Sequence, residues 1–200
     1  MAKAETGQII VKPTADSLMK AAREAQKGGK IPPVHLWNPE FCGDLDMEIR
    51  RDGTWFYMGT PIGRHALVKL FSSILKLEDG QYFLVTPVEK VGIRVVDKPF
   101  VAVDIEAAGA GAEQVISFTT NVEDTVIAGP EHPIRVVRDE EGEPSPYVMV
   151  RAGMEALIDR KSFYRLVDLG ESHVIDGTDW FGVWSQATFF PIIPVADLDG

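Results

Sequence analysis

The sequence predicts an α+β protein built from two related β-hairpin/helix/strand repeats, with mostly antiparallel sheets that are each covered by a helix. The first observation is composition: 45% of the 200 residues are apolar and 25% are charged, as in packed globular proteins. The second is a series of short alternating segments bounded by Gly, Pro and Asp. The third is an internal echo, in which residues 61–71 (PIGRHALVKLF) resemble residues 157–167 (LIDRKSFYRLV), with identities at Ile62/Ile158, Arg64/Arg160 and Leu70/Leu166.

The chain length suits either one large domain or two domains of roughly 100 residues each. We expect residues 1–30 to form a lead-in with a short helix, residues 31–98 the first α+β repeat and residues 99–200 the second. Each copy would end in an aromatic strand, YFLV (82–85) in the first and WFGV (180–183) in the second. The alternative is that β–helix–β units converge on this pattern without duplication.

The net charge of the chain argues against two classes of binding partner. Thirty acidic and twenty basic residues give a net charge of −10. This charge repels nucleic-acid backbones and anionic lipids, so we expect neither nucleic acid nor a membrane as partner. The N-terminal MAKAETGQIIVKP lacks an apolar secretion signal, and the longest apolar tract, residues 189–196, is too short to span a bilayer. With Cys42 as the only cysteine, no intrachain disulfide can form, and we expect a soluble, cytoplasmic protein.

The N-terminal region predicts one helix and one extended segment. The helix would be capped by Asp16 or Ser17 and would stop at Gly28-Gly29. Residues 31–40 contain too many prolines for a helix or a central strand. We therefore expect an extended segment there, anchored by Trp37.

The first repeat has the clearest local signals. Residues 45–59 alternate between apolar and polar on both sides of Asp52-Gly53, which predicts a β-hairpin. Thr60-Pro61 is typical of a helix N-cap and first helical position, so we expect a helix from there, followed by strands over 81–87 and 91–97. The apolar positions expected on one stripe of this helix are Ile62, Leu67, Leu70, Phe71, Ile74 and Leu75.

The second repeat begins with a predicted hairpin over 100–121. Residues 132–158 predict further strands, two of them joined by the acidic loop 139–146. Asp159 is expected to cap the second helix, and residues 179–190 are expected to form the strand after it.

Four motifs of the first repeat are characteristic of one group of bacterial proteins: DGTW (52–55), PIGR (61–64), LVKLF (67–71) and LVTPVEK (84–90). From about Trp37 to its end, the chain resembles the domain-of-unknown-function-1285 family. The resemblance implies a duplicated α+β architecture and a suspected signalling or ligand-binding role. Since the family has no established reaction, no catalytic residue carries over and the catalytic residues are unknown. Arg64 and Glu89 lie inside the matching motifs, which makes them candidates for binding.

The sequence predicts neither a metal nor a cofactor. The four histidines are scattered, and the spacings typical of metal ligands are missing from the sequence. The glycine-rich stretch GAGAE (109–113) lacks the phosphate-loop pattern and precedes a strand, so we expect a mobile hairpin tip. Cys42 lies close in sequence to Glu40 and Asp44, acids that disfavour a thiolate, and we expect a buried, unreactive side chain.

Acidic residues around the first hairpin form one candidate site. Asp46 and Glu48 share a face of one strand, where two carboxyl groups could act as general acid and base. The alternative, which we favour, is a solvated strand face opposite Met47 and Ile49.

The two arginines of the echo form another candidate site. Arg64 and Arg160 are each expected in the first turn of a helix, where a cation opposes the helix dipole. We favour an ion pair with an acid on a neighbouring strand, namely Asp46, Glu48 or Glu89. The functional alternative is that Arg64 holds an anionic ligand in a cleft between helix and sheet.

The candidate ligand-binding residues are Arg64, Glu89, Asp46, Arg160 and Trp37. The first hypothesis is a non-enzymatic module with a signalling or regulatory role, which binds an unknown small molecule or protein in the groove between the repeats. The alternative is a hydrolase or isomerase that uses carboxylates near the first hairpin, with Arg64 as anion clamp. A homo-oligomeric scaffold with residues 189–196 at its interface is compatible with either.

Overall fold

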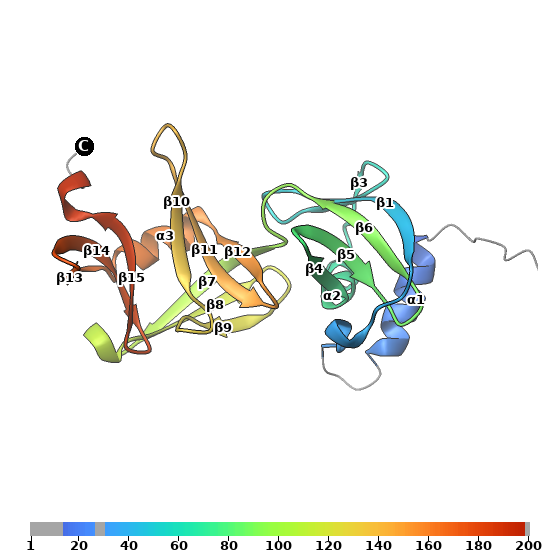
Figure 1. Cartoon of the computed structure of the whole chain (residues 1–200), viewed down its shortest axis with the longest axis horizontal. Coiled ribbons are helices and arrows are strands. Elements are labelled where there is room, and N and C mark those ends of the chain that lie inside the picture. The colour runs from blue at the N-terminus through green and yellow to red at the C-terminus, as the bar shows by residue number, and fades with distance from the viewer. Residues whose placement is uncertain (1–13, 27–30, 199–200) are drawn as a thin grey trace, which may run out of the picture.

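The structure is a computed structural model that describes residues 14–26 and 31–198. The strands in this part of the chain form two six-stranded sheets and one three-stranded sheet. Figure 1 shows the large sheets side by side along the long axis, with the small sheet at the C-terminal end. Each large sheet has one parallel pair and otherwise antiparallel neighbours, so the predicted α+β class with mostly antiparallel sheets is confirmed.

The first sheet has the strand order β3-β2-β1-β6-β5-β4. Two antiparallel three-stranded meanders meet at its centre, where β1 runs parallel to β6. Helix α2 (His65–Ser73) connects the meanders, and helix α1 (Ala15–Ala25) packs against α2. The strands are β1 (Phe41–Ile49), β2 (Trp55–Tyr57), β3 (Thr60–Pro61), β4 (Leu75–Glu78), β5 (Gln81–Val85) and β6 (Lys90–Val95).

The second sheet has the order β10-β11-β12-β7-β8-β9, again with a parallel central pair, β12 and β7. Helix α3 (Arg160–Val167) follows it and packs against β7. The strands are β7 (Phe100–Ala108), β8 (Val115–Thr120), β9 (Thr125–Ile127), β10 (Ile134–Arg138), β11 (Pro144–Arg151) and β12 (Met154–Ile158), and the small sheet contains β13 (Glu171–Ile175), β14 (Thr178–Ser185) and β15 (Thr188–Pro194). Short 3-10 turns are η1 (Val34–Leu36), η2 (Gly111–Glu113) and η3 (Val195–Asp197).

The duplication lies in the large sheets. When the strands are numbered within their own half, both sheets have the order third, second, first, sixth, fifth, fourth. In both, the first strand pairs in parallel with the sixth. The copied unit is therefore a six-stranded sheet, in which β1 corresponds to β7.

The two helices of the echo do not occupy equivalent places. Helix α2 connects the third and fourth strands of its sheet, whereas α3 follows the sixth strand of the other. The predicted equivalence of residues 61–71 and 157–167 is therefore wrong. Counted from the N-caps Arg64 and Asp159, the echo is also displaced by one residue. The likeness arises because short helices that cover a sheet need apolar residues at the same spacing.

Helix α2 begins later than predicted. Thr60–Pro61 forms the short strand β3, and the amide of Ile62 donates to the carbonyl of Trp55, which keeps the chain extended. A proline fits there because an edge strand does not need every amide for pairing. Arg64 is the N-cap, and Leu75, predicted on the helical stripe, already belongs to β4.

Of the helix caps predicted for α3 and α1, the first is confirmed and the second is wrong. Asp159 caps α3 as predicted, because its carboxylate accepts a hydrogen bond at 2.7 Å from the amide three residues on. Helix α1 is capped by Thr14 instead of Asp16 or Ser17; the Thr14 hydroxyl accepts from the Ser17 amide at 3.2 Å, and the Ser17 hydroxyl accepts in return from the Thr14 amide. The predicted stop at Gly28-Gly29 lies outside the described residues.

The C-terminal aromatic segment forms a hairpin, not the single strand predicted over 179–190. Its turn, Gln186-Ala187, has positive φ at both residues (49° and 56°) without Gly or Asn, so the usual sequence signal is missing. The two amides of this turn donate to the carbonyls of Gln114 and Ala112. The segment 109–113, expected as a mobile tip, is thus held against the small sheet.

One apolar core runs through both halves. Trp55 of β2 stacks on Phe71 of α2, with ring centroids 6.4 Å apart. Leu18 of α1 and Leu166 of α3 are fully buried in the same core. The three helices are therefore anchored by packing, and the two halves share buried surface.

The turn of the first hairpin contacts the second half. Gly53 has a φ of +81°, and its carbonyl accepts a hydrogen bond from the Asn121 side-chain amide at 3.4 Å. The Asn121 side-chain oxygen accepts from the Val101 amide at 3.0 Å, which fixes the side chain. A Cβ atom at residue 53 would lie 2.6 Å from Asn121 Nδ2 and 2.9 Å from Val101 Cγ2. Glycine is therefore required by conformation and by the close approach of the halves.

Gly53→Ala is expected to destabilise the protein more than Gly59→Ala. Both residues have positive φ, but nothing lies within 4 Å of a Cβ at Gly59. Gly59→Ala should lower the free energy of unfolding by about 1 kcal/mol through backbone strain alone. Gly53→Ala should lower the free energy of unfolding by about 1–3 kcal/mol more, because the new Cβ atom clashes with Asn121 and Val101. Denaturant unfolding measures both, and equal losses would contradict a tight contact between the halves.

Candidate binding site between the halves

A cavity of about 270 Å³ lies between the two halves. Its walls come from the end of α1, from the C-terminal part of α2 and from two turns of the second half. The residues that line it are Gln26, Ile31, Lys69, Ser72, Ser73, Val122, Asp124 and Arg151. Segments far apart in the sequence thus contribute to one polar cavity.

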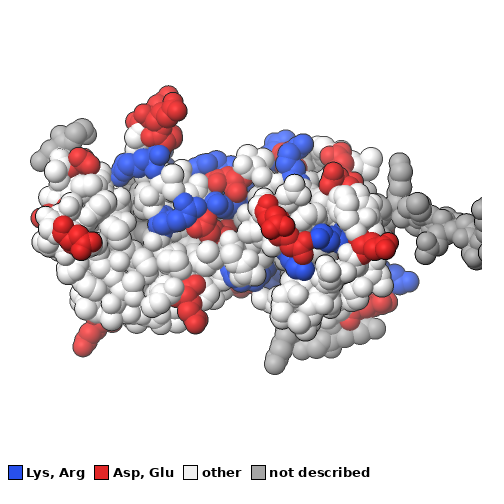
Figure 2. All heavy atoms as spheres, in the orientation of Figure 1, with Lys and Arg blue, Asp and Glu red and all other residues white. Residues whose placement is uncertain are grey.

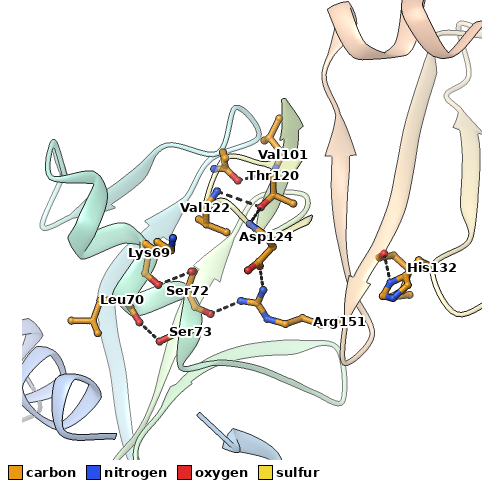
Figure 3. A network of polar contacts seen from close by, with 12 residues as sticks. Lys69, Leu70, Ser72, Ser73, Val101, Thr120, Val122, Asp124, His132 and Arg151 are labelled. Carbon is orange, nitrogen blue, oxygen red and sulfur yellow. Dashed lines mark hydrogen bonds and ion pairs between the residues drawn. The ribbon is translucent and has the colours of Figure 1, made fainter. Parts of the chain in front are cut away.

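Arg151 bridges the halves at this cavity, as Figure 3 shows. The residue ends β11, and its guanidinium forms an ion pair with Asp124 in the β8–β9 turn. Nη2 of the guanidinium donates to the carbonyl of Ser72 in the last turn of α2 at 2.9 Å. The guanidinium also lies over the Phe100 ring, 4.6 Å from its centroid. A cation at a helix C-terminus satisfies an unpaired carbonyl and complements the helix dipole.

The electrostatics of Arg151 reflect its burial. Loss of solvent lowers the pKa of the guanidinium to about 10, since burial disfavours the charged form. The side chain is still protonated at neutral pH, and the adjacent Asp124 carboxylate favours that state. Side-chain exposure is 19% for Arg151 and 22% for Asp124, so the pair is largely withdrawn from water. Removal of one partner would leave the other charge poorly solvated.

The cavity lining carries one net positive charge. Lys69 and Arg151 are cations, and Asp124 is the one acid among the described lining residues. Glu123, which pairs with Lys69, is exposed. Arg151 makes two hydrogen bonds to protein acceptors within the described chain, while a guanidinium has five N–H donors. Three N–H groups of the Arg151 guanidinium are therefore left for a bound molecule or water, in a chain that is otherwise strongly acidic.

The two serine hydroxyls of the lining are bound to their own helix. The hydroxyls of Ser72 and Ser73 donate to the carbonyls of Lys69 and Leu70 in their own helix, at 2.8 and 2.6 Å. The described lining contains no His or Cys. A hydroxyl held by a carbonyl has no adjacent base to take its proton, so these serines are not arranged as nucleophiles.

The structure places Arg64 and Glu89 at different ends of α1. Arg64 lines a hollow of about 250 Å³ between α1 and α2, together with Arg23. Both carboxylate oxygens of Glu89 accept from the hydroxyl of Ser17 at 3.3 Å, which holds the start of α1. Within the described chain Arg64 has no ion pair, so the favoured pairing with a strand acid is wrong. The physical reason is that α2 starts at His65, which places Arg64 before the helix.

Of the two strand acids, Glu48 forms ion pairs, whereas Asp46 forms none within the described residues. Asp46 is exposed on β1, and Glu48 beside it pairs with Arg94 of β6 and with Arg50. The hydrogen bond from Arg94, followed by that from Arg50, holds the pKa of Glu48 below its ordinary value although partial desolvation opposes them. Glu48 is therefore kept ionised, and this face corresponds to the solvated strand that we favoured over an acid/base pair.

The remaining two candidates lie elsewhere. Arg160 is exposed, donates to the Tyr164 hydroxyl at 2.9 Å and lines a hollow of about 420 Å³ with Phe163. Trp37 is half-buried, and its carbonyl accepts from Lys76 Nζ at 3.0 Å. None of the five predicted binding residues is among the residues that line the inter-half cavity.

Cys42 is exposed, which contradicts the expected buried side chain. The first residues of β1 extend beyond the core, and Met47 is the first residue of this strand that is buried. The residues that build the cavity were also missed. Arg151 is 27 residues from Asp124 and 79 from Ser72, so no local pattern could have connected them.

A second polar network holds the linker between the sheets. Arg51 pairs with Asp97 of the linker at 2.9 Å and donates to the Ser145 hydroxyl at 2.7 Å. The Tyr147 hydroxyl donates to the same Asp97 carboxylate at 3.0 Å. The linker is therefore tied to the first hairpin and to β11 of the second sheet.

Glu155 continues this network on the second sheet. Arg135 donates two hydrogen bonds to its carboxylate, both at 2.6 Å, and Lys98 pairs with it at 2.9 Å. The bidentate arginine holds the pKa of Glu155 below its ordinary value, against the opposing effect of burial. Both cations also lie over the ring of Tyr147.

The comparisons with known proteins agree with this two-sheet architecture. The model "Domain of unknown function (DUF1285), N-terminal domain" matches residues 32–98, and "Protein of unknown function (DUF1285), C-terminal domain" matches residues 99–192. The chain belongs to the DUF1285 family. The resemblance inferred from the sequence motifs is thereby confirmed.

Two crystal structures of DUF1285 family proteins are similar to this chain. The one from Silicibacter pomeroyi DSS-3 is 61% identical, with a TM-score of 0.83, and the match covers 92% of this chain and 98% of that one. The one from Shewanella baltica OS155 is 29% identical with a TM-score of 0.49, over 62% of this chain and 91% of that one. No curated protein matches the chain.

The described part of this DUF1285 protein contains neither a candidate membrane span nor a candidate metal cluster. Across residues 14–26 and 31–198, no helix has the length and apolarity needed to cross a membrane. In the same ranges no three His, Cys, Asp or Glu side chains are grouped so that they could hold a metal ion.

Arg151→Met is expected to lower the free energy of unfolding by about 3 kcal/mol, the lower end for a buried pair, because each side chain keeps some exposure. Arg94→Met, which removes a cation that is 71% exposed, should cost at most about 1 kcal/mol. Chemical unfolding of both variants checks this.

The double variant Arg151→Met/Asp124→Leu separates the ion pair from packing. It should be more stable than Arg151→Met alone, because no unpaired carboxylate is left. A double variant that is less stable than the single one would show that the pair is not what stabilises this contact.

Stability should fall in acid partly through Glu155. Its folded pKa lies below the ordinary 4.5, so its contribution is present above that pH and is lost as the pH falls through the folded pKa. Glu155→Gln should flatten the decrease in unfolding free energy between about pH 5 and pH 3. Glu140→Gln in the exposed β10–β11 loop is the control, and an identical slope in wild type and Glu155→Gln would contradict the assignment.

Proposed function

We propose that this DUF1285 protein is a non-enzymatic binding module that takes a small anionic molecule into the cavity between its halves. The supporting observation is the sign of the lining charge. A chain with a net charge of −10 carries a positive cavity there, lined by Lys69 and Arg151 against the single acid Asp124. Selective concentration of cations inside an acidic protein favours an anionic guest.

The size of the cavity limits the ligand class. Ligand pockets commonly measure about 300–1,000 Å³, and the volume here is about 270 Å³. A small carboxylate or a phosphate group fits this volume, whereas a whole nucleotide would not be enclosed. The apolar parts of Ile31 and Val122 would contact the body of the guest.

The position of the cavity supports a regulatory role as part of this proposal. Its walls belong to both halves, and Arg151 contacts α2 of the first half as well as Asp124 of the second. A ligand that binds the guanidinium would favour one relative arrangement of the halves over others. The binding event would thereby change the surfaces that the two halves present to a partner.

A thermal-shift screen with small carboxylates and inorganic phosphate tests this proposal, because a ligand of the native state raises the melting temperature. Compounds that do so are then titrated against Gln26→Glu, which adds a negative charge to the cavity wall with little change in shape. We expect at least about tenfold weaker binding, equivalent to about 1.4 kcal/mol.

Gln81→Glu is the matched control, since Gln81 is exposed and lies outside the cavity. At a salt concentration that screens the added surface charge, Gln81→Glu should bind the anion with an affinity within about twofold of the wild type. A screen without any stabilising anion, or equal losses in the two variants, would refute the proposal.

A further inference from the structure

Five cations lie on the first sheet, its first hairpin turn, the linker and the second sheet. Arg94 and Arg50 contact Glu48, Arg51 contacts Asp97, and Lys98 and Arg135 contact Glu155. Tyr147 connects the last two groups, because it donates to Asp97 and lies beneath the two cations that contact Glu155. We define the cation strip as these five residues: Arg50, Arg51, Arg94, Lys98 and Arg135.

The four arginines of the strip are exposed, Lys98 is 23% exposed, and the partner acids are covered. The side chains of Arg94, Arg50, Arg51 and Arg135 are 71, 55, 54 and 46% exposed, against 16, 14 and 11% for Glu48, Asp97 and Glu155. Five cations and three acids leave an excess of two positive charges. An approaching molecule therefore meets guanidinium groups first.

Aromatic rings hold part of the strip in place. The Arg50 guanidinium lies 3.7 Å from the centroid of the Phe56 ring, and that of Arg135 lies 4.7 Å from the centroid of Tyr147. These contacts, with the ion pairs beneath, fix the orientation of the donors before any partner arrives. Preorganised donors lose less entropy on binding.

The acidic loop, residues 139–143, has the opposite charge. Asp139, Glu140, Glu141 and Glu143 are exposed, and none of them forms an ion pair within the described chain. The Asp139 side chain accepts from the amides of Glu141 and Glu143 at 3.0 and 2.9 Å, which gives the loop a defined shape. The loop projects beyond β10 and β11 in Figure 1, and Figure 2 shows it covered with acidic side chains.

The strip and the loop lie next to each other. Arg51 of the strip and Glu143 of the loop line the same hollow of about 420 Å³. In Figure 2 basic side chains, interspersed with acidic ones, lie across the face, and the acidic loop projects from the second half at the upper left, with basic side chains at its base. A two-fold axis between adjacent patches of opposite charge sets each patch against its complement on a second copy.

We propose that a second copy of this chain is the partner of the cation strip, and that each copy inserts its acidic loop against the strip of the other. The loop supplies four carboxylates, and the strip supplies an excess of two positive charges on oriented donors. The contact is isologous, electrostatic and weakened by salt. It uses none of the residues that line the inter-half cavity, so it stands independently of the proposed ligand.

Sedimentation velocity of the full chain tests the proposal. We expect association in about 0.05 M NaCl that weakens at least about tenfold in 0.5 M NaCl, because exposed charges are screened there. The loop variant Glu140→Lys/Glu141→Lys and the strip variant Arg50→Glu/Arg94→Glu should each be monomeric, since like charges then face each other. Glu106→Lys/Glu113→Lys, with the same change of net charge at exposed positions outside the loop, should associate like the wild type.

Mixing the loop and strip variants gives the decisive measurement. In a mixed dimer the native strip meets the native loop, and the reversed strip meets the reversed loop, so association should return to near the wild-type level. Circular dichroism checks that each variant is folded. If the strip variant fails to fold, the loop variant and the salt series still decide the question.

Three results would overturn the proposal: a wild type that is monomeric at low salt up to millimolar concentration, association that ignores salt, or a loop variant that associates normally. A poly-glutamate peptide is titrated against the monomeric protein in parallel. Binding of that peptide without self-association would assign the strip to an acidic partner instead of a second copy.

Discussion

The contact between the halves depends on one desolvated cation. Arg151 leaves water to pair with Asp124 and to bind the carbonyl of Ser72 in the last turn of α2, at the point where the second sheet meets this helix. Such a charge is tolerated only because both acceptors are present, and each acceptor comes from a different half. Arg151 and Lys69 both line the cavity at this contact. The charge of Arg151 is balanced by Asp124, so the net positive charge of the lining comes from Lys69.

A second set of ion pairs fixes the linker. It differs from the Arg151 pair in the exposure of its cations to solvent. Arg51, Asp97, Tyr147 and Glu155 form a chain in which the acids are covered and the cations remain in solvent. Arg151 is withdrawn from water and stabilises an internal contact, whereas the strip displays its charge outward. The chain thus has one largely buried cation at the cavity between the halves and a separate set of outward cations. The whole chain, with thirty acidic and twenty basic residues, has a net charge of −10.

Local signals predicted local structure well. Asp52-Gly53 formed the expected hairpin turn, and Asp159 capped α3, because each acts through bonds within a few residues. The predicted equivalence of residues 61–71 and 157–167 was wrong, because apolar spacing indicates that a helix covers a sheet but not which strands the helix connects. Thr60-Pro61 matched a helix start, yet pairing with β2 kept it extended. Of the five candidate binding residues, none lines the cavity, because its residues meet only after the sheets pack.

The sequence by itself determined the α+β class, most strand segments, the family and the acidic charge balance, because these follow from composition, alternation, caps and motifs that act over short distances. The tertiary structure alone decided that the duplicated unit is a six-stranded sheet, that Cys42 is exposed and that Arg151 meets Asp124 and Ser72. These outcomes depend on contacts between segments up to 79 residues apart, whose free energy comes from burial and charge pairing in the packed chain.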